Sequence, residues 1–413
     1  MTVLKHVEQS DALRAGGVAA NRFRRAGALA GGIAGFFPIL GSSLPPGVGL
    51  VAYLLSLAIV ALVVWPTRAH GSAQQLAGLF AALVLACIVG AREVFDGLIP
   101  PQTALALAAG VAGAILLAIT GSSRRSVGFF AMFVGGGTVL ASGEAIRVLA
   151  GGNVHASVVA FGLNPIILAH YSSLAALVAL VMLVRGEWRF LGLISFAVCV
   201  FGTILTASRG PVIGLVVGAI FVLLTRGGGS ARWMRGLGAR LVALLYVLVL
   251  ALVLLGLHGQ ALLEQWLRTG DEDGNASTRV RAWDAAWSTI RSHPLSGGGI
   301  GRYAEGAPGF TLGLPDYPHN LLLESWAEAG FFAGAALVIA LALVARRAGL
   351  AGAPFVIMGV IDFSVSGSLN SSVTLWICCA FALIMGTREI AASRTPRIKI
   401  RQTPRPAFTE RAR

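Results

Sequence analysis

The stretch LVALLYVLVLALVLLGL, residues 241–257, decides the fold class of this chain. A second uncharged apolar block, LVAYLLSLAIVALVV, covers Leu50–Val64, and arginine-bearing gaps separate such blocks along the sequence. A helix of about 20 apolar residues crosses the hydrocarbon of a bilayer. The chain of 413 residues is 56% hydrophobic and only 12% charged, whereas a soluble domain carries about 25% charged residues. We therefore expect an all-α polytopic membrane protein.

The apolar blocks predict about 12 transmembrane helices, several of them short or rich in glycine. Short spans of this kind can be tilted, broken or re-entrant. The predicted spans are 27–43, 48–65, 75–91, 103–120, 127–142, 160–184, 190–207, 211–225, 241–257, 329–345, 349–366 and 372–387.

The distribution of Lys and Arg predicts the orientation of these spans. Cytoplasmic loops of membrane proteins carry an excess of Lys and Arg. If the N-terminus is cytoplasmic, 24 of the 32 Lys and Arg residues fall on the cytoplasmic side and 8 on the other. The bias supports an even number of spans with both termini in the cytoplasm.

The spans divide the chain into five segments, and one connection stands out by its length. The stretch 258–328 is the only connection long enough to form an external loop domain, and it contains Trp283, Trp287, His293 and His319. The basic tail is expected to contact anionic membrane lipids on the cytoplasmic face. The predicted segments are the N-terminus 1–26, helices 1–9 in 27–257, the loop domain 258–328, helices 10–12 in 329–387, and the tail 388–413.

Arg209 lies in the sequence TASRGP, residues 206–211, between the seventh and eighth predicted spans. We expect this arginine to end the seventh span at the outer boundary of the bilayer, with Pro211 starting the next helix. A guanidinium held there could bind phosphate through paired hydrogen bonds. The alternative is an interfacial residue that interacts with the helix C-terminus.

Arg279 and Arg281 lie in the sequence STRVRAWDAAW, residues 277–287. A helix of about four turns is predicted here, with Ser277 or Thr278 as its cap and an apolar stripe against the membrane-side body. Cations are disfavoured at a helix N-terminus, so two arginines there suggest a shared anion. Pairing with nearby acids is the alternative for both, and Arg281 is the weaker candidate. The stripe consists of Val280, Trp283, Trp287 and Ile290.

His319 lies in the sequence DYPHNLLLE, residues 316–324, just before the tenth predicted span. Pro318 fits the first turn of a helix, which would place His319 at the positive end of the helix dipole. The dipole and nearby arginines should lower its pKa and leave a neutral imidazole able to accept a proton. A structural interfacial histidine is the alternative. The run Gly297–Gly301 lacks the Lys-Ser/Thr of a P-loop and is expected to form a tight turn.

These segments together resemble the shared region of the O-antigen ligases, O-antigen polymerases and bacterial protein O-oligosaccharyltransferases. The resemblance covers about residues 190–345. It rests on Ser208-Arg209-Gly210, on Arg279-x-x-x-Trp283 leading to Pro294-x-x-Gly297, and on Pro318-His319-Asn320-x-x-Leu323 followed by Gly330. The family often has glycine before the loop arginine, where this chain has Thr278.

The resemblance implies a GT-C-type glycosyltransferase in the bacterial inner membrane, with its active site and loop domain facing the periplasm. The implied donor is O-antigen linked to undecaprenyl diphosphate, and the implied acceptor is lipid A–core oligosaccharide. Arg209 and Arg279 would bind the diphosphate, and His319 would act on the acceptor hydroxyl. No metal is expected, since the acidic run Asp271–Asp273 should be solvated and is not expected to bind one. No other cofactor and no nucleic acid are expected either.

Three other functions remain open at this point. An O-antigen polymerase would use the same donor with a second lipid-linked chain as acceptor. A protein O-oligosaccharyltransferase is less favoured because no further domain is expected after the last span. A transporter would need charged residues within the membrane, and Asp362 in the eleventh predicted span is the one candidate.

Overall fold

The structure is a computed structural model that describes residues 127–150, 164–186, 189–225, 275–299, 302–303, 317–365 and 373–394. Throughout these ranges the regular secondary structure is helical. The predicted spans 27–43, 48–65, 75–91, 103–120 and 241–257 lie outside the described residues, as do the N-terminus 1–26, the acidic run 271–273 and most of the tail.

The described helices follow the predicted apolar segments closely in the middle of the chain. Predicted spans 160–184, 190–207 and 211–225 correspond to helices that begin and end within a few residues of those limits. The helices are α5 (Val127–Leu149), α6 (Pro165–Arg185), α7 (Arg189–Leu205), α8 (Arg209–Thr225), α10 (Asn275–Ser292), α11 (Leu321–Val365) and α12 (Val373–Arg394).

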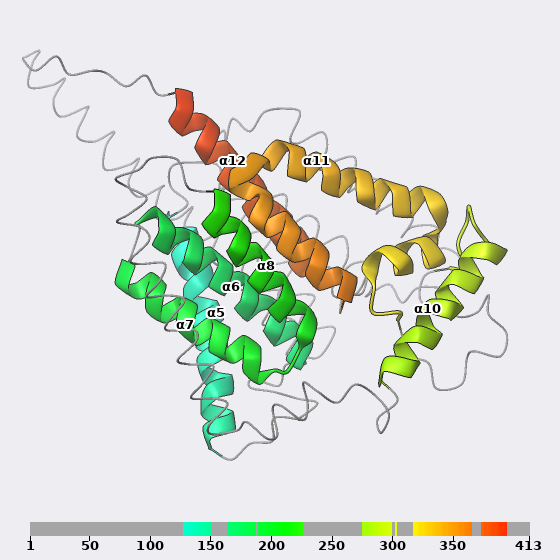
Figure 1. The fold of residues 1–413 in the computed structure, drawn as a ribbon, viewed down its shortest axis with the longest axis horizontal. Coiled ribbons are helices and arrows are strands. Elements are labelled where there is room, and N and C mark those ends of the chain that lie inside the picture. Colours follow the sequence, from blue (N-terminus) through cyan, green and yellow to red (C-terminus); the bar gives the residue numbers. More distant parts are fainter. Residues whose placement is uncertain are drawn as a thin grey trace, which may run out of the picture.

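Helix α6 forms the centre of a helical bundle (Figure 1). Asn164 caps its first turn, with its side-chain oxygen accepting a hydrogen bond from the backbone N–H of Ile166 at 2.8 Å. Every residue from Leu168 to Leu183 is buried. A helix that is apolar all round needs neighbours on every side, and α5, α7, α8, α11 and α12 all contact α6.

Helix α11 is three helical segments joined at two glycines. Gly330 has φ 80° and Gly349 has φ 57°, so the helical hydrogen-bond pattern breaks at both residues. The segments that follow the two breaks correspond to predicted spans 329–345 and 349–366. The segment before Gly330 lies in the predicted loop domain, close to the helix start that Pro318 suggested. Glycine fits both positions because a Cβ atom disfavours the left-handed backbone region.

Helix α5 continues beyond its predicted end at residue 142 to Leu149. Glu144 is buried and lies one turn before Arg147, which donates hydrogen bonds to its carboxylate from Nε at 2.9 Å and from Nη2 at 2.6 Å. The Arg147 guanidinium balances the charge of the buried Glu144 carboxylate and provides its hydrogen bonds. The helix can therefore extend past the apolar block.

Among the described helices, two are long and apolar enough to cross a membrane by length and composition: α6 and α11. Three shorter apolar helices cover Phe190–Leu205, Arg209–Thr225 and Thr374–Gly386. These helices and the all-helical described region agree with a helical membrane protein. The predicted number of 12 spans includes segments beyond the described residues.

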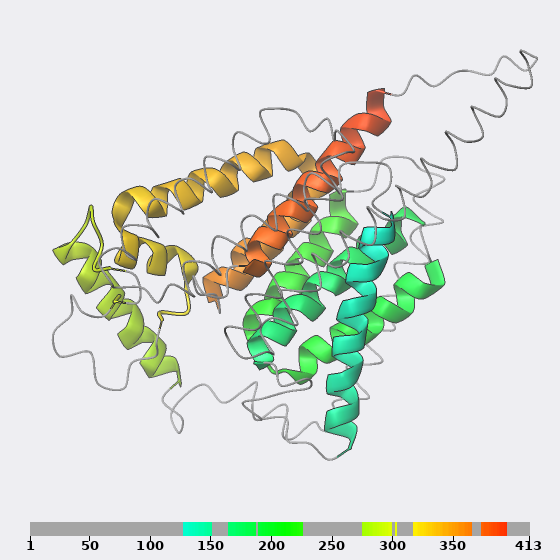
Figure 2. The ribbon, with the colours of Figure 1, turned by 180° about the vertical axis from the view of Figure 1, so that it is seen from behind.

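Helix α10 lies beyond one end of the bundle, beside the first segment of α11 (Figure 2). It begins at Asn275 and not at Ser277 or Thr278. The predicted apolar stripe was largely wrong: Val280 is 55%, Trp283 41% and Trp287 43% exposed, and only Ile290 is buried. Small side chains let α10 approach its neighbours closely, so the buried face consists of Ala282, Ala285, Ala286, Thr289 and Ile290.

Candidate functional site

Arg209 is the first residue of α8, immediately after the tight connection from α7. It was expected to end the seventh span, but α7 ends at Leu205. Ala207 in the connection adopts φ 53°, and the backbone N–H of Ser208 donates to Oγ1 of Thr206 at 3.4 Å. The positive end of the α8 dipole and the Arg209 guanidinium therefore lie at the same place.

Arg279 extends from α10 to the end of α11. Its Nη1 donates a hydrogen bond to the carbonyl oxygen of Val365, the last residue of α11, at 3.3 Å. Burial lowers the pKa of Arg279, and the positive charge of Arg209 lowers it further. The two guanidinium groups therefore share one electrostatic environment, although they come from separate helices.

An arginine side chain is cationic at neutral pH in proteins. Two positive charges at a partly buried place repel each other. Burial removes water that would otherwise screen this repulsion. An anion with several oxygens would stabilise such an arrangement, and it would receive hydrogen bonds from both planar guanidinium groups.

His319 lies in the same electrostatic environment. Burial lowers its pKa to about 4, and the charge of Arg279 contributes to this shift. Its Nδ1 atom is buried and has no hydrogen-bond partner among the described residues. The predicted direction of the pKa shift is confirmed, but the largest cause is burial, which the sequence did not reveal.

The backbone around His319 differs from the predicted helix start. Pro318 and His319 precede α11, and the cap is Asn320, whose Oδ1 accepts a hydrogen bond from the N–H of Leu323 at 3.1 Å. His319 adopts φ 55°, in the left-handed region. Such a conformation in a residue other than glycine is uncommon and occurs often at functional sites.

Trp283 fixes the segment that carries His319. Its Nε1 donates a hydrogen bond to the carbonyl oxygen of Pro318 at 2.8 Å. Residues four apart lie on one face of a helix, so Arg279 and Trp283 both face this segment. The spacing Arg279-x-x-x-Trp283 thus has a structural reason: one side chain supplies charge and the other holds the histidine segment.

Tyr317 is a site residue that the sequence reasoning did not select. Its ring centroid lies 4.3 Å from that of His319, and its interaction with Arg279 opposes part of the lowering of the pKa of that arginine. Its position two residues before His319 was the only available signal. Such proximity in sequence does not show that both rings turn to the same side.

The glycine run after α10 is a tight turn held against the first segment of α11, as the sequence predicted for its described part. The N–H groups of Gly298 and Gly299 donate to the carbonyl oxygens of Ala327 at 2.8 Å and Glu328 at 2.9 Å. At Gly297, with φ 72°, an added Cβ would collide with the Glu328 carbonyl oxygen. The turn therefore positions α10 relative to α11.

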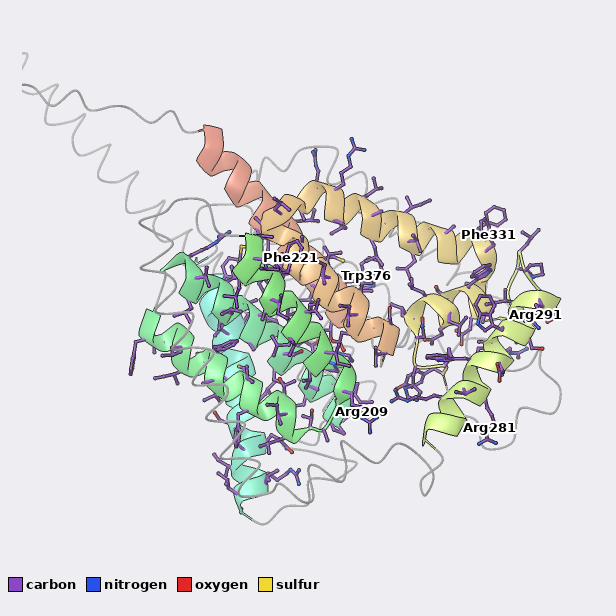
Figure 3. The ribbon with its side chains drawn as sticks, viewed as in Figure 1. Arg209, Phe221, Arg281, Arg291, Phe331 and Trp376 are labelled. Atoms are coloured by element: carbon purple, nitrogen blue, oxygen red, sulfur yellow. The ribbon has the colours of Figure 1, made fainter. Side chains whose placement is uncertain are left out.

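The structure brings together Arg209, Arg279 and His319 but not Arg281. Arg281 is exposed on α10 and points away from the bundle, whereas Arg209 lies at the end of α8 (Figure 3). His293 is also exposed, at the far end of α10. Within the described ranges no group of three or more His, Cys, Asp and Glu side chains could hold a metal ion.

Asp362, the residue that kept a transporter in consideration, is buried in the structure. Its Oδ2 lies 2.6 Å from Nδ1 of His170 on α6. Charged residues within a membrane are usually paired in this way. The pair gives Asp362 a specific partner inside the bundle, close to the end of α11.

The sequence comparison agrees with the motifs that form this site. Residues 194–338 match the O-antigen ligase family, and the match includes Arg209, Arg279 and His319. This match supports membership of that region in the O-antigen ligase/polymerase superfamily. No curated protein matches the chain.

Proposed function

We propose that this protein is an O-antigen ligase. It would transfer O-antigen polysaccharide from undecaprenyl diphosphate to lipid A–core oligosaccharide at the periplasmic face of the bacterial inner membrane. The observation that carries the proposal is the convergence of Arg209, Arg279 and His319 from three separate segments of the chain.

The two arginines would bind the diphosphate of the donor. Each guanidinium can form paired hydrogen bonds with phosphoryl oxygens, and the repulsion between the two cations is relieved when the dianionic group binds. The same contacts strengthen as negative charge develops on the departing diphosphate. Arg209 and Arg279 would thus stabilise the transition state as well as hold the donor.

His319 would act as the general base. The acceptor hydroxyl oxygen attacks the anomeric carbon of the donor sugar, and the bond from that carbon to the diphosphate oxygen breaks. The bonding electron pair leaves with undecaprenyl diphosphate, and the hydroxyl proton moves to His319. The lowered pKa keeps this imidazole neutral before the reaction, which is the protonation state that a base requires.

We further propose that the chemistry is metal-independent and of GT-C type. A diphosphate is already an activated leaving group, so charge stabilisation by two arginines and alignment of the acceptor suffice in principle. Both lipid-linked substrates would enter sideways from the bilayer. In this arrangement both termini are cytoplasmic, and the loop domain 258–328 faces the periplasm.

The lipopolysaccharide banding pattern of a ligase-deletion strain tests the function. Complementation with this chain should restore the long-chain ladder, whereas the variant Arg279→Ala should express and insert but leave polymer on the lipid carrier. If the chain instead restores polymerisation in a polymerase-deletion strain and leaves ligation absent, the enzyme is an O-antigen polymerase.

A further inference from the structure

A buried His–Asp pair connects α6 and α11, one helical turn from the Val365 carbonyl group that contacts Arg279. Nδ1 of His170 and Oδ2 of Asp362 are 2.6 Å apart, with side chains only 1% and 2% exposed. The His170 ring also stacks on Phe363, with ring centroids 4.8 Å apart and an interplanar angle of 11°. When Asp362 is ionised, Nδ1 carries the proton and donates to the carboxylate.

The position of this pair connects it to both arginines of the site. Asp362 lies one helical turn before Val365, whose carbonyl oxygen accepts the hydrogen bond from Arg279. On the other side, α8 approaches α11 so closely that a Cβ added at Gly214 would lie 3.3 Å from Cβ of Asp362. Gly214 is in the second turn of α8, the helix that Arg209 begins.

Packing alone does not require a charged pair at this place. Replacing a buried ion pair with apolar side chains of similar volume is often neutral or stabilising, whereas removing one partner is costly. The hydrogen bond between the two side chains is directional. It therefore fixes the rotation and the axial position of one helix relative to the other. Here it fixes the last turn of α11 against α6.

We propose that His170 and Asp362 are positioning residues for diphosphate binding. They hold the end of α11, and thus the Val365 carbonyl group, at the height that places Arg279 beside Arg209. Neither side chain contacts the substrate in this arrangement. The inference rests on the proposed role of the two arginines and assigns the pair to the same site.

A double-mutant cycle tests this role with purified full-length protein in lipid nanodiscs and undecaprenyl diphosphate as the probe. Asp362→Leu, which removes the acceptor of this hydrogen bond, should weaken probe binding about tenfold, within the range for residues coupled through a shared segment. In the Arg279→Ala background the same change should have almost no further effect, because the group that it positions is gone. Equal weakening in both backgrounds would refute the inference.

Two further comparisons separate positioning from simple loss of stability. His170→Gln keeps a side-chain N–H donor and should bind the probe nearly as well as wild type, whereas His170→Leu should bind about tenfold more weakly. Glu144→Gln, which weakens the other buried ion pair, should lower thermal stability but leave probe affinity unchanged. If His170→Leu binds normally, the positioning role is wrong, even if Asp362→Leu fails to fold.

The cycle also distinguishes this inference from the proposed function. If Arg279→Ala alone retains full affinity for undecaprenyl diphosphate, the assigned role of the arginine is wrong. If Arg279→Ala loses affinity while the His170 and Asp362 variants keep it, only the positioning role fails.

Discussion

Replacing His319 with alanine should slow the transfer step while leaving the donor bound. A positioned general base contributes about 10²- to 10⁴-fold to a rate. We therefore expect turnover of His319→Ala to fall by a factor in that range. Affinity for undecaprenyl diphosphate should change little, because Arg209 and Arg279 supply the positive charge.

The pH dependence follows from the surroundings of His319. Burial and the charge of Arg279 lower its pKa from 6.5 to about 4. At pH 5 an ordinary histidine is about 97% protonated, whereas a histidine with pKa 4 is about 10% protonated. In the free enzyme the base should thus remain active well below pH 6. A bound diphosphate offsets the positive charge of Arg279, so the pKa of His319 should be higher in the donor complex than in the free enzyme.

Turnover by purified enzyme between pH 4 and pH 8 tests the low pKa of His319 in the free enzyme and its rise in the donor complex. The profile of kcat/KM reports the free enzyme and that of kcat reports the donor complex, so the acid limb of kcat/KM should lie at lower pH. Both limbs should vanish in His319→Ala, which separates histidine titration from titration of the diphosphate. A kcat/KM limb near pH 6.5, or a limb that persists in the alanine variant, would refute the assignment.

Four other outcomes follow from the site. Arg209→Lys and Arg279→Lys should each restore little transfer in the lipopolysaccharide assay, because a lysine cannot form the paired hydrogen bonds of a guanidinium; a normal ladder from both variants would contradict this. Purified enzyme should turn over in excess chelator, and activity that returns only with added Mg²⁺ or Mn²⁺ would show that a metal takes part. Trp283→Phe keeps the ring but loses the hydrogen bond to the Pro318 carbonyl, so kcat should fall about fivefold, matching about 1 kcal/mol for one hydrogen bond, with donor KM unchanged. Gly330→Ala should lower the free energy of unfolding by at least about 1–2 kcal/mol, the cost of a left-handed residue with a Cβ atom, whereas the control Gly135→Ala, with open space around the added Cβ, should not.

The sequence predicted the membrane class, most described helix limits and the three segments that carry the candidate site. These features depend on local properties: apolar length, charge near span ends, and residues that start or end helices. The lowered pKa of His319 was also predicted in direction, because a helix start and the arginines of the site were both expected to oppose its protonation. The family match over residues 194–338 confirms the resemblance that the same segments suggested.

Tertiary structure decided the features that depend on contacts between distant segments. The buried face of α10 consists mainly of small residues because it packs closely against α11, so the tryptophans lie at its exposed edge. The proximity of Arg209 to Arg279 depends on the relative positions of α8, α10 and the end of α11. The pairing of His170 with Asp362 spans 192 residues of sequence. Hydropathy and charge patterns report which residues enter the membrane, but which side chains meet there is determined by helix packing.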